Sequence, residues 1–191
     1  INDSQIMTVH KNLPNLITIF RIILVPVFGY FIFMPSKPQG IWWALVIFVI
    51  ASISDYFDGY LARKYNLVTA FGKIMDPLAD KILVLVAMVS LTFVPMHWLN
   101  PIILIIIALR EIAVTILRDY HAKRNHVIAA NIWGKLKTVT QMVGIVAALL
   151  IYALVREEVS EGTLLGIQIY FWIVALITIL SGLNYFFIKH E

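Results

Sequence analysis

Long apolar runs constrain the fold of this chain more than any other feature. The 191 residues are 61% hydrophobic, with a mean hydropathy of +0.87, which is typical of a polytopic membrane protein rather than a soluble one. About 20 helical residues cross the hydrocarbon core of a bilayer. We therefore predict an all-α bundle of six transmembrane helices, at about 14–34, 41–64, 72–93, 101–120, 134–154 and 164–188. A polar N-terminal segment, 1–13, would precede this single domain, 14–191.

The placement of the basic residues predicts the orientation of the bundle. Basic residues in short loops favour the cytoplasmic side of a membrane. Only Lys37 and Arg156 fall on one side of the predicted bundle. We therefore expect both termini on the cytoplasmic side. We also expect the protein to lie in the cell membrane and to have no nucleic-acid partner. The other side carries nine basic residues: Lys11, Arg63, Lys64, Lys73, Lys123, Arg124, Lys135, Lys137 and Lys189.

Four aspartates lie where the second and third apolar runs approach each other in sequence. Asp55 and Asp58 are spaced i,i+3, and Asp76 and Asp80 are spaced i,i+4, so each pair shares one face of its helix. If the two faces are opposed, four carboxylates converge, and cations must offset their repulsion. The chain has no cysteine, and oxygen ligands suit hard cations. We predict a site for one or two Mg²⁺ or Mn²⁺ ions.

Small residues and one arginine accompany the aspartates. Gly59, Ala62 and Gly72 leave room for a large group beside the metal site. Arg63 can bind a phosphate through two N–H groups of its guanidinium. The pattern therefore predicts a metal-bound phosphate or diphosphate as the ligand.

The spacing D-x2-D-G-x2-A-R-x8-G-x3-D-x3-D resembles the signature of the CDP-alcohol phosphotransferases. The resemblance implies a membrane enzyme that moves a phosphatidyl group from a CDP-linked lipid to an alcohol and releases CMP. By similarity, Asp55, Asp58 and Asp76 would hold the metals, and Asp80 would be a metal ligand, the general base, or both. All eight positions of the signature are met here, by Asp55, Asp58, Gly59, Ala62, Arg63, Gly72, Asp76 and Asp80.

Polar residues also recur along the first apolar run. Asn15, Thr18 and Arg21 follow at i, i+3 and i+6, so they form a stripe on an otherwise apolar helix. One interpretation is that Arg21 reaches the membrane surface from a helix end. We favour a stripe that faces the active site, with Asn15 and Thr18 at the CDP-linked lipid and Arg21 at the acceptor. The phrase LPNLITIFR, residues 13–21, resembles the start of the phosphatidylglycerophosphate synthase branch of the family.

Basic residues of the fourth and fifth runs predict an acceptor that carries its own phosphate. We assign Arg110, Arg118, Lys135 and Lys137 to this phosphate, although such cations also anchor helices at membrane surfaces. Arg110 lies deep in its run, where a charge is costly, and pairing with Glu111 or with an aspartate of the signature is the structural alternative. The phrases REIAVTILR and GKLKT are similar to those of phosphatidylglycerophosphate synthases, which implies sn-glycerol 3-phosphate as the acceptor and CDP-diacylglycerol as the donor.

Other functions fit parts of the pattern. Inositol phosphate would use the same cations, and phosphatidylglycerol, serine or another amino alcohol are further acceptors within the family. A divalent-cation transporter is the alternative from another class, but its acidic residues would form a path across the membrane. Here the aspartates gather at one end of the predicted helices. Gly144 and Gly182 allow close helix approach, so a homodimer remains open.

Overall fold

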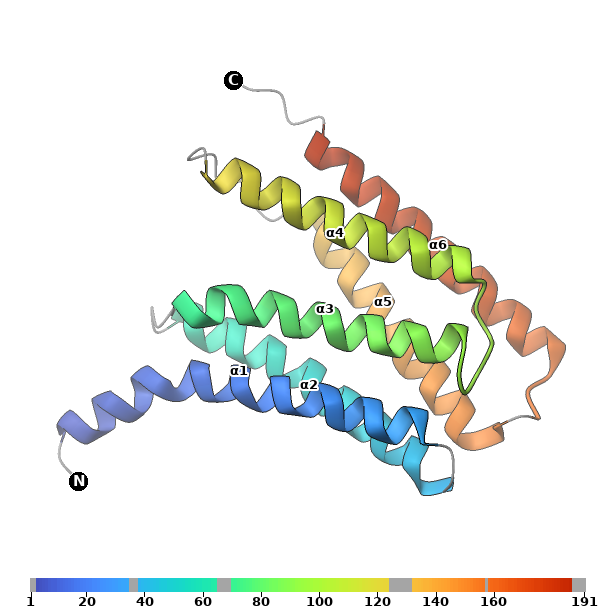
Figure 1. Cartoon of the computed structure of the whole chain (residues 1–191), viewed down its shortest axis with the longest axis horizontal. Coiled ribbons are helices and arrows are strands. Elements are labelled where there is room, and N and C mark those ends of the chain that lie inside the picture. Colours follow the sequence, from blue (N-terminus) through green and yellow to red (C-terminus); the bar gives the residue numbers. More distant parts are fainter. Residues whose placement is uncertain (1–2, 35–37, 65–69, 124–131, 157, 187–191) are drawn as a thin grey trace. The chain divides into compact units, whose positions relative to one another are not determined.

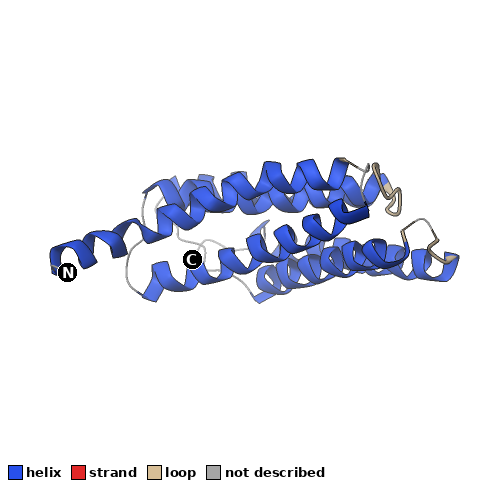
Figure 2. Cartoon of the chain, turned by 90° about the horizontal axis from the view of Figure 1, so that it is seen from below, coloured by secondary structure: helices blue, strands red, loops and turns tan. Residues whose placement is uncertain are grey.

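The computed structural model describes residues 3–34, 38–64, 70–123, 132–156 and 158–186, and these are mostly helical (Figure 1). No strand occurs in these ranges (Figure 2). The all-α prediction is therefore confirmed for the described residues. The described residues form six helices: α1 (Asp3–Phe33), α2 (Pro38–Lys64), α3 (Ala70–Thr92), α4 (Pro101–Lys123), α5 (Ile132–Val155) and α6 (Glu161–Phe186).

The helix ends follow local signals in the sequence. Pro38 and Pro101 each open a helix, a position where the missing N–H of proline costs nothing. The side chain of Asn100 accepts a hydrogen bond from the Ile102 N–H at 2.9 Å and so caps α4. The largest difference from the predicted boundaries is at the first helix, because α1 begins at Asp3 and includes most of the expected polar segment. Pro14 removes one backbone donor but does not end this helix.

The chain forms two compact units, of which the first covers residues 1–87. In this unit α1 packs against α2, and the fully buried rings of Phe28 and Phe48 lie 5.6 Å apart between the two helices. On α1, a Cβ added to Gly29 would lie 3.9 Å from the Val86 side chain of α3. The first three helices thus supply the core of the first unit.

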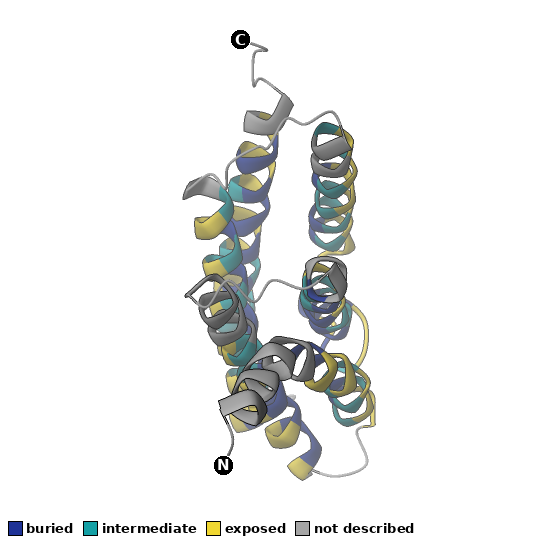
Figure 3. Ribbon diagram, turned by 90° about the vertical axis from the view of Figure 1, so that its left-hand side faces the viewer, coloured by how far each residue is buried: buried dark blue, intermediate teal, exposed yellow. Residues whose placement is uncertain are grey.

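The second unit covers residues 88–191, and its helix α6 packs against both α4 and α5 (Figure 1). Buried and exposed residues alternate around its helices (Figure 3). On α6, the hydroxyl of Tyr170 donates to the Thr140 carbonyl of α5 at 2.8 Å. The same ring lies over Gly144, where an added Cβ would be only 2.5 Å from it. An apolar groove of about 360 Å³ lies along this contact.

Apolar surface and helix length suggest a membrane protein. Among the described residues, two helical stretches are long and apolar enough to cross a bilayer, Gly134–Val155 and Glu161–Leu183. The stretches Ile17–Phe33 and Gln39–Ser54 are apolar but shorter. Large apolar side chains also point outward, including Leu154 at 65% exposure. Soluble proteins rarely expose extended apolar surface of this kind.

Candidate active site

The aspartate signature lies on α2 and α3 of the first unit. Helix α2 continues to Lys64, so its backbone carries Asp55 and Asp58 less than one turn apart, although their side chains lie outside the described residues. On α3, Asp76 and Asp80 are about one turn apart and both are half-buried. The side chains of three further signature residues, Gly59, Ala62 and Arg63, also lie outside the described set, whereas Gly72 is buried on α3.

Asp76 is held by two polar residues of α1. The hydroxyl of Thr18 donates to Asp76 Oδ1 at 2.6 Å, and Arg21 Nη1 lies 3.8 Å from the same oxygen. Thr18 and Arg21 are both fully buried, whereas about a third of the Asp76 side chain is exposed. The spacing of the polar stripe predicted that these two side chains face one direction, and the structure brings both to one carboxylate.

This arrangement suits a hard cation but does not define a metal site by itself. In the part of the chain whose side chains are described, no group of three His, Cys, Asp or Glu residues is placed to hold a metal ion. The donors that are described, Asp76 and Asp80, are carboxylates, and such oxygens match the preference of Mg²⁺ and Mn²⁺. A carboxylate oriented by a neighbouring hydroxyl is also typical of metal ligands. The residues present therefore fit the predicted ions.

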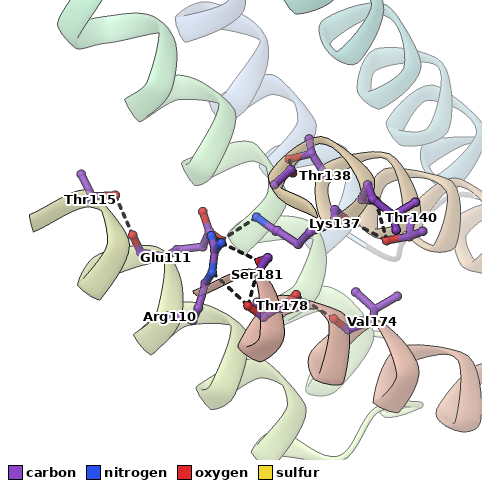
Figure 4. A network of polar contacts seen from close by, with 11 residues as sticks. Arg110, Glu111, Thr115, Lys137, Thr138, Thr140, Val174, Thr178 and Ser181 are labelled. Carbon is purple, nitrogen blue, oxygen red and sulfur yellow. Dashed lines mark hydrogen bonds and ion pairs between the residues drawn. The ribbon is translucent and has the colours of Figure 1, made fainter. Parts of the chain in front are cut away.

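A second polar cluster lies in the second unit (Figure 4). Glu111 of α4 accepts two hydrogen bonds at one oxygen, Oε1, from Lys137 Nζ of α5 at 2.5 Å and from Arg110 Nη1 at 2.9 Å. All three side chains are about nine-tenths buried. Lys137 and Arg110, both predicted to bind the acceptor phosphate, are thus close together. The pairing of Arg110 with Glu111, foreseen as its structural alternative, is present.

Helix α6 holds the other side of the Arg110 guanidinium. Arg110 Nε donates to the Thr178 carbonyl at 3.1 Å, and Nη2 donates to Ser181 Oγ at 2.6 Å. Gly182 lets the arginine lie close to the helix, since a Cβ there would be 3.3 Å from Arg110 Cγ. Each of the three guanidinium nitrogens therefore has a different partner, which fixes the plane of the group.

The remaining predicted residues are less fully defined. Lys135 is exposed on α5, and the side chains of Arg118 and Asn15 lie outside the described residues. Sequence reasoning missed the contact of Lys137 with Glu111 and the role of Ser181, although Thr178, Ser181 and Gly182 give a polar and small face on an apolar helix. It also missed Gln141, which follows Lys137 by about one turn. The Gln141 side chain is buried, and its Nε2 has no hydrogen-bond partner within the described part of the chain.

Comparison with known proteins now identifies the class. The profile of the CDP-alcohol phosphatidyltransferase family matches residues 11–183, which include most of α1 and α6, the whole of α2 to α5, and both polar clusters. The chain belongs to this family and is a phosphatidyltransferase. The resemblance read from the aspartate signature is therefore confirmed, and the transporter alternative is set aside.

Individual relatives match over almost the whole chain. A protein of Bacillus subtilis (strain 168), named CDP-diacylglycerol–glycerol-3-phosphate 3-phosphatidyltransferase, is 41% identical over 188 residues, 92% of this chain and 93% of its own. A protein of the same name from Rickettsia prowazekii (strain Madrid E) is 38% identical, over 94% and 96% of the two chains. A third, from Wigglesworthia glossinidia brevipalpis, is 34% identical, over 93% and 94%.

Proposed function

We propose that this enzyme transfers the phosphatidyl group of CDP-diacylglycerol to sn-glycerol 3-phosphate, giving phosphatidylglycerophosphate and CMP. The single observation that carries the proposal is the similarity to relatives of that name, 34–41% identical over more than nine-tenths of the chain. The buried cations of the second unit support it, because an acceptor with its own phosphate needs positive partners.

The aspartate signature is the proposed site for the CDP-linked lipid. Two divalent ions, Mg²⁺ or Mn²⁺, would be held by the signature carboxylates, and when bound they would offset negative charge on the diphosphate. The hydrogen bond from Thr18 supports this assignment, because it fixes one carboxylate oxygen of Asp76. The proposed ligands are Asp55, Asp58, Asp76 and Asp80, and the proposed CDP-lipid contacts are Asn15, Thr18, Gly59, Ala62, Arg63 and Gly72.

Asp80 is the proposed general base, with metal ligation as a second role. It would accept the proton of the attacking glycerol hydroxyl while the oxygen bonds to the lipid-linked phosphorus. The bond from that phosphorus to the CMP oxygen breaks in the same step, and CMP leaves with the electron pair. No covalent intermediate with the protein is needed. The partial exposure of Asp80 supports this role, because a base must be reachable by the substrate.

The acceptor phosphate is assigned to the cationic residues Arg21, Arg110, Arg118, Lys135 and Lys137. Lys137 and Arg110 retain N–H donors beyond those bound by the described residues, since an ammonium has three and a guanidinium five. For Arg21, the ion pair with Asp76 favours a second role in holding that carboxylate. A phosphate monoester carries about 1.5 to 2 negative charges at neutral pH, so several cations suit it.

We further propose six membrane-spanning helices in the cell membrane, with both termini and the active site on the cytoplasmic side. The excess of lysine and arginine on one side of the predicted bundle supports this orientation. A water-soluble nucleotide such as CMP would then leave into the cytoplasm. A homodimer is compatible with the small residues of α5 and α6.

The test is an assay of the purified enzyme with CDP-diacylglycerol and Mg²⁺. Glycerol 3-phosphate, inositol phosphate, serine and phosphatidylglycerol would be offered in parallel, and the lipid product identified by mass spectrometry. We expect phosphatidylglycerophosphate, with CMP released in equal amount. If only inositol phosphate gives a product, the enzyme is still a phosphatidyltransferase, but the assignment of glycerol 3-phosphate as its acceptor is wrong.

A further inference from the structure

We propose that Glu111 is a positioning residue that holds Lys137 and Arg110 close to each other and ready for the acceptor phosphate. The inference rests on the proposed function, in which these two cations bind glycerol 3-phosphate. Glu111 itself, being negative, would not contact the phosphate. Its role is to act through the two cations.

The geometry of Glu111 is that of a shared counter-ion. Its Oε1 lies 2.5 Å from Lys137 Nζ and 2.9 Å from Arg110 Nη1, so both cations meet at one oxygen. Two unscreened positive charges this close would repel strongly in a buried site. The carboxylate offsets one of the two charges, and the three groups together keep a net charge of about +1. That surplus remains available to an anion.

The helices fix the carboxylate in place between the two cations. Arg110 and Glu111 are neighbours on α4, and successive residues of a helix point about 100° apart. Arg110 therefore reaches α6, where Ser181 and the Thr178 carbonyl bind it, while Glu111 reaches Lys137 on α5 (Figure 4). The cluster ties three helices together through one acid and two bases.

Among the described residues, the bonds made by Lys137 and Arg110 do not use all of their N–H donors. Lys137 uses one of its three N–H groups on Glu111, and Arg110 uses three of its five on Glu111, Thr178 and Ser181. The remaining N–H groups have directions fixed by the bonds already made. A fixed donor loses little conformational entropy when a phosphate binds. Glu111 therefore lowers the cost of acceptor binding without touching the acceptor.

The experiment measures steady-state kinetics of Glu111→Gln with each substrate varied in turn. Removing one partner of a buried charge pair is costly, so we expect the KM for glycerol 3-phosphate to rise about tenfold or more. The KM for CDP-diacylglycerol should stay within about twofold of the wild-type value. Glu111→Asp keeps the charge, but its side chain is one methylene shorter. Its KM for glycerol 3-phosphate should fall between those of the wild type and Glu111→Gln. The matched control is Glu158→Gln, an exposed glutamate outside the helices, which should leave both KM values unchanged.

A second variant keeps the proposal testable if Glu111→Gln does not fold. Ser181→Ala removes the 2.6 Å hydrogen bond from Arg110 Nη2 and the 2.9 Å hydrogen bond that the same hydroxyl donates to the Thr178 carbonyl. It should raise the KM for glycerol 3-phosphate several-fold with little effect on the other substrate. If Glu111→Gln folds, an unchanged or lowered KM for glycerol 3-phosphate overturns the positioning role, since the glutamate would then be idle or would compete with the phosphate. If it does not fold, an unchanged KM in Ser181→Ala overturns the role. If the wild-type enzyme makes no product from glycerol 3-phosphate, the proposed function itself fails, and the subsite fails with it.

Discussion

At the scale of single residues, the orientation of Asp76 depends on a hydroxyl from a different helix. Thr18 donates to Asp76 Oδ1 at 2.6 Å from a fully buried position. Thr18→Val has a similar shape but lacks the donor, so the carboxylate would be free to rotate. Loss of such a supporting partner typically weakens metal affinity or activity about 10- to 100-fold. We expect this loss as a weaker Mn²⁺ affinity, measured by titration with electron paramagnetic resonance.

The matched variant is Thr18→Ser, which keeps the hydroxyl and should bind Mn²⁺ about as well as the wild type. Equal affinity in Thr18→Val and Thr18→Ser would mean that the hydrogen bond does not orient a metal ligand. Thr18→Ser removes the methyl group, whereas Thr18→Val removes the hydrogen-bond donor. It therefore separates packing from hydrogen bonding.

Asp80 gives the second prediction for a single residue. Asp80→Asn keeps the shape and removes the basic carboxylate, so turnover should fall by at least about a hundredfold, in the range of a lost general base. Binding of CDP-diacylglycerol, measured by calorimetry in detergent, should be largely kept if Asp80 acts as the base alone. Loss of that binding as well would assign Asp80 to the metal ligands.

The polar contacts differ in how far the sequence predicted them. The i,i+3 spacing of Thr18 and Arg21 predicted a shared face, and both side chains meet Asp76. The contact of Lys137 with Glu111 joins residues 26 apart in sequence, so it depends on how α4 and α5 approach each other. Helical periodicity carries no information about such pairs. The roles of these residues in catalysis remain predictions.

At the scale of helices, the contact of α5 with α6 depends on the missing side chain of Gly144. An added Cβ would lie 2.5 Å from the Tyr170 ring, and the hydroxyl of that ring is bound to the Thr140 carbonyl. Gly144→Ala should therefore destabilise the protein by about 1–3 kcal/mol, as overpacked cores do. The measurement is the thermal unfolding temperature in detergent.

Gly166 of α6 is the matched control for this substitution. It lines the same groove, but a Cβ there meets nothing within 4 Å. Gly166→Ala should leave stability unchanged or raise it by up to about 1 kcal/mol, because alanine is the better helix former. If Gly144→Ala and Gly166→Ala unfold at the same temperature, the Tyr170 ring can move away from the added methyl group without loss of stability, which contradicts the prediction.

Helix positions were largely predictable because prolines and polar loop residues lie at the ends of the apolar runs. The predicted starts of the fourth and fifth helices agree with α4 and α5 to within two residues. The exception is α1, which begins at Asp3 rather than near Pro14. The hydropathy pattern marks only where the apolar part of this helix starts, and it does not show how far the helix extends beyond that part. The pattern could not predict that α6 packs against both α4 and α5, since α1, α2, α5 and α6 all carry similar apolar stretches.

At the scale of the whole molecule, the charge distribution predicts which loops face the cytoplasm. The chain has no cysteine, so a single introduced cysteine would be the one site in the chain that a maleimide labels. Lys123→Cys, at the end of α4, should be labelled by a membrane-impermeant maleimide only after the cells are opened. Glu158→Cys, between α5 and α6, should be labelled in intact cells, in the periplasm or at the outer face. The opposite pattern would invert the proposed topology.

The most direct test of the shared cation site is a count of Mn²⁺ ions bound by the purified enzyme in the presence of CDP-diacylglycerol, followed by electron paramagnetic resonance. Asp58→Ala on α2 and Asp76→Ala on α3 would be compared with the wild type and with Glu158→Ala as the control. We predict up to two saturable ions in the wild type and the control, loss of binding in both aspartate variants, and loss of phosphatidyl transfer with it. Unchanged Mn²⁺ binding in either aspartate variant would contradict a site built by the two helices together.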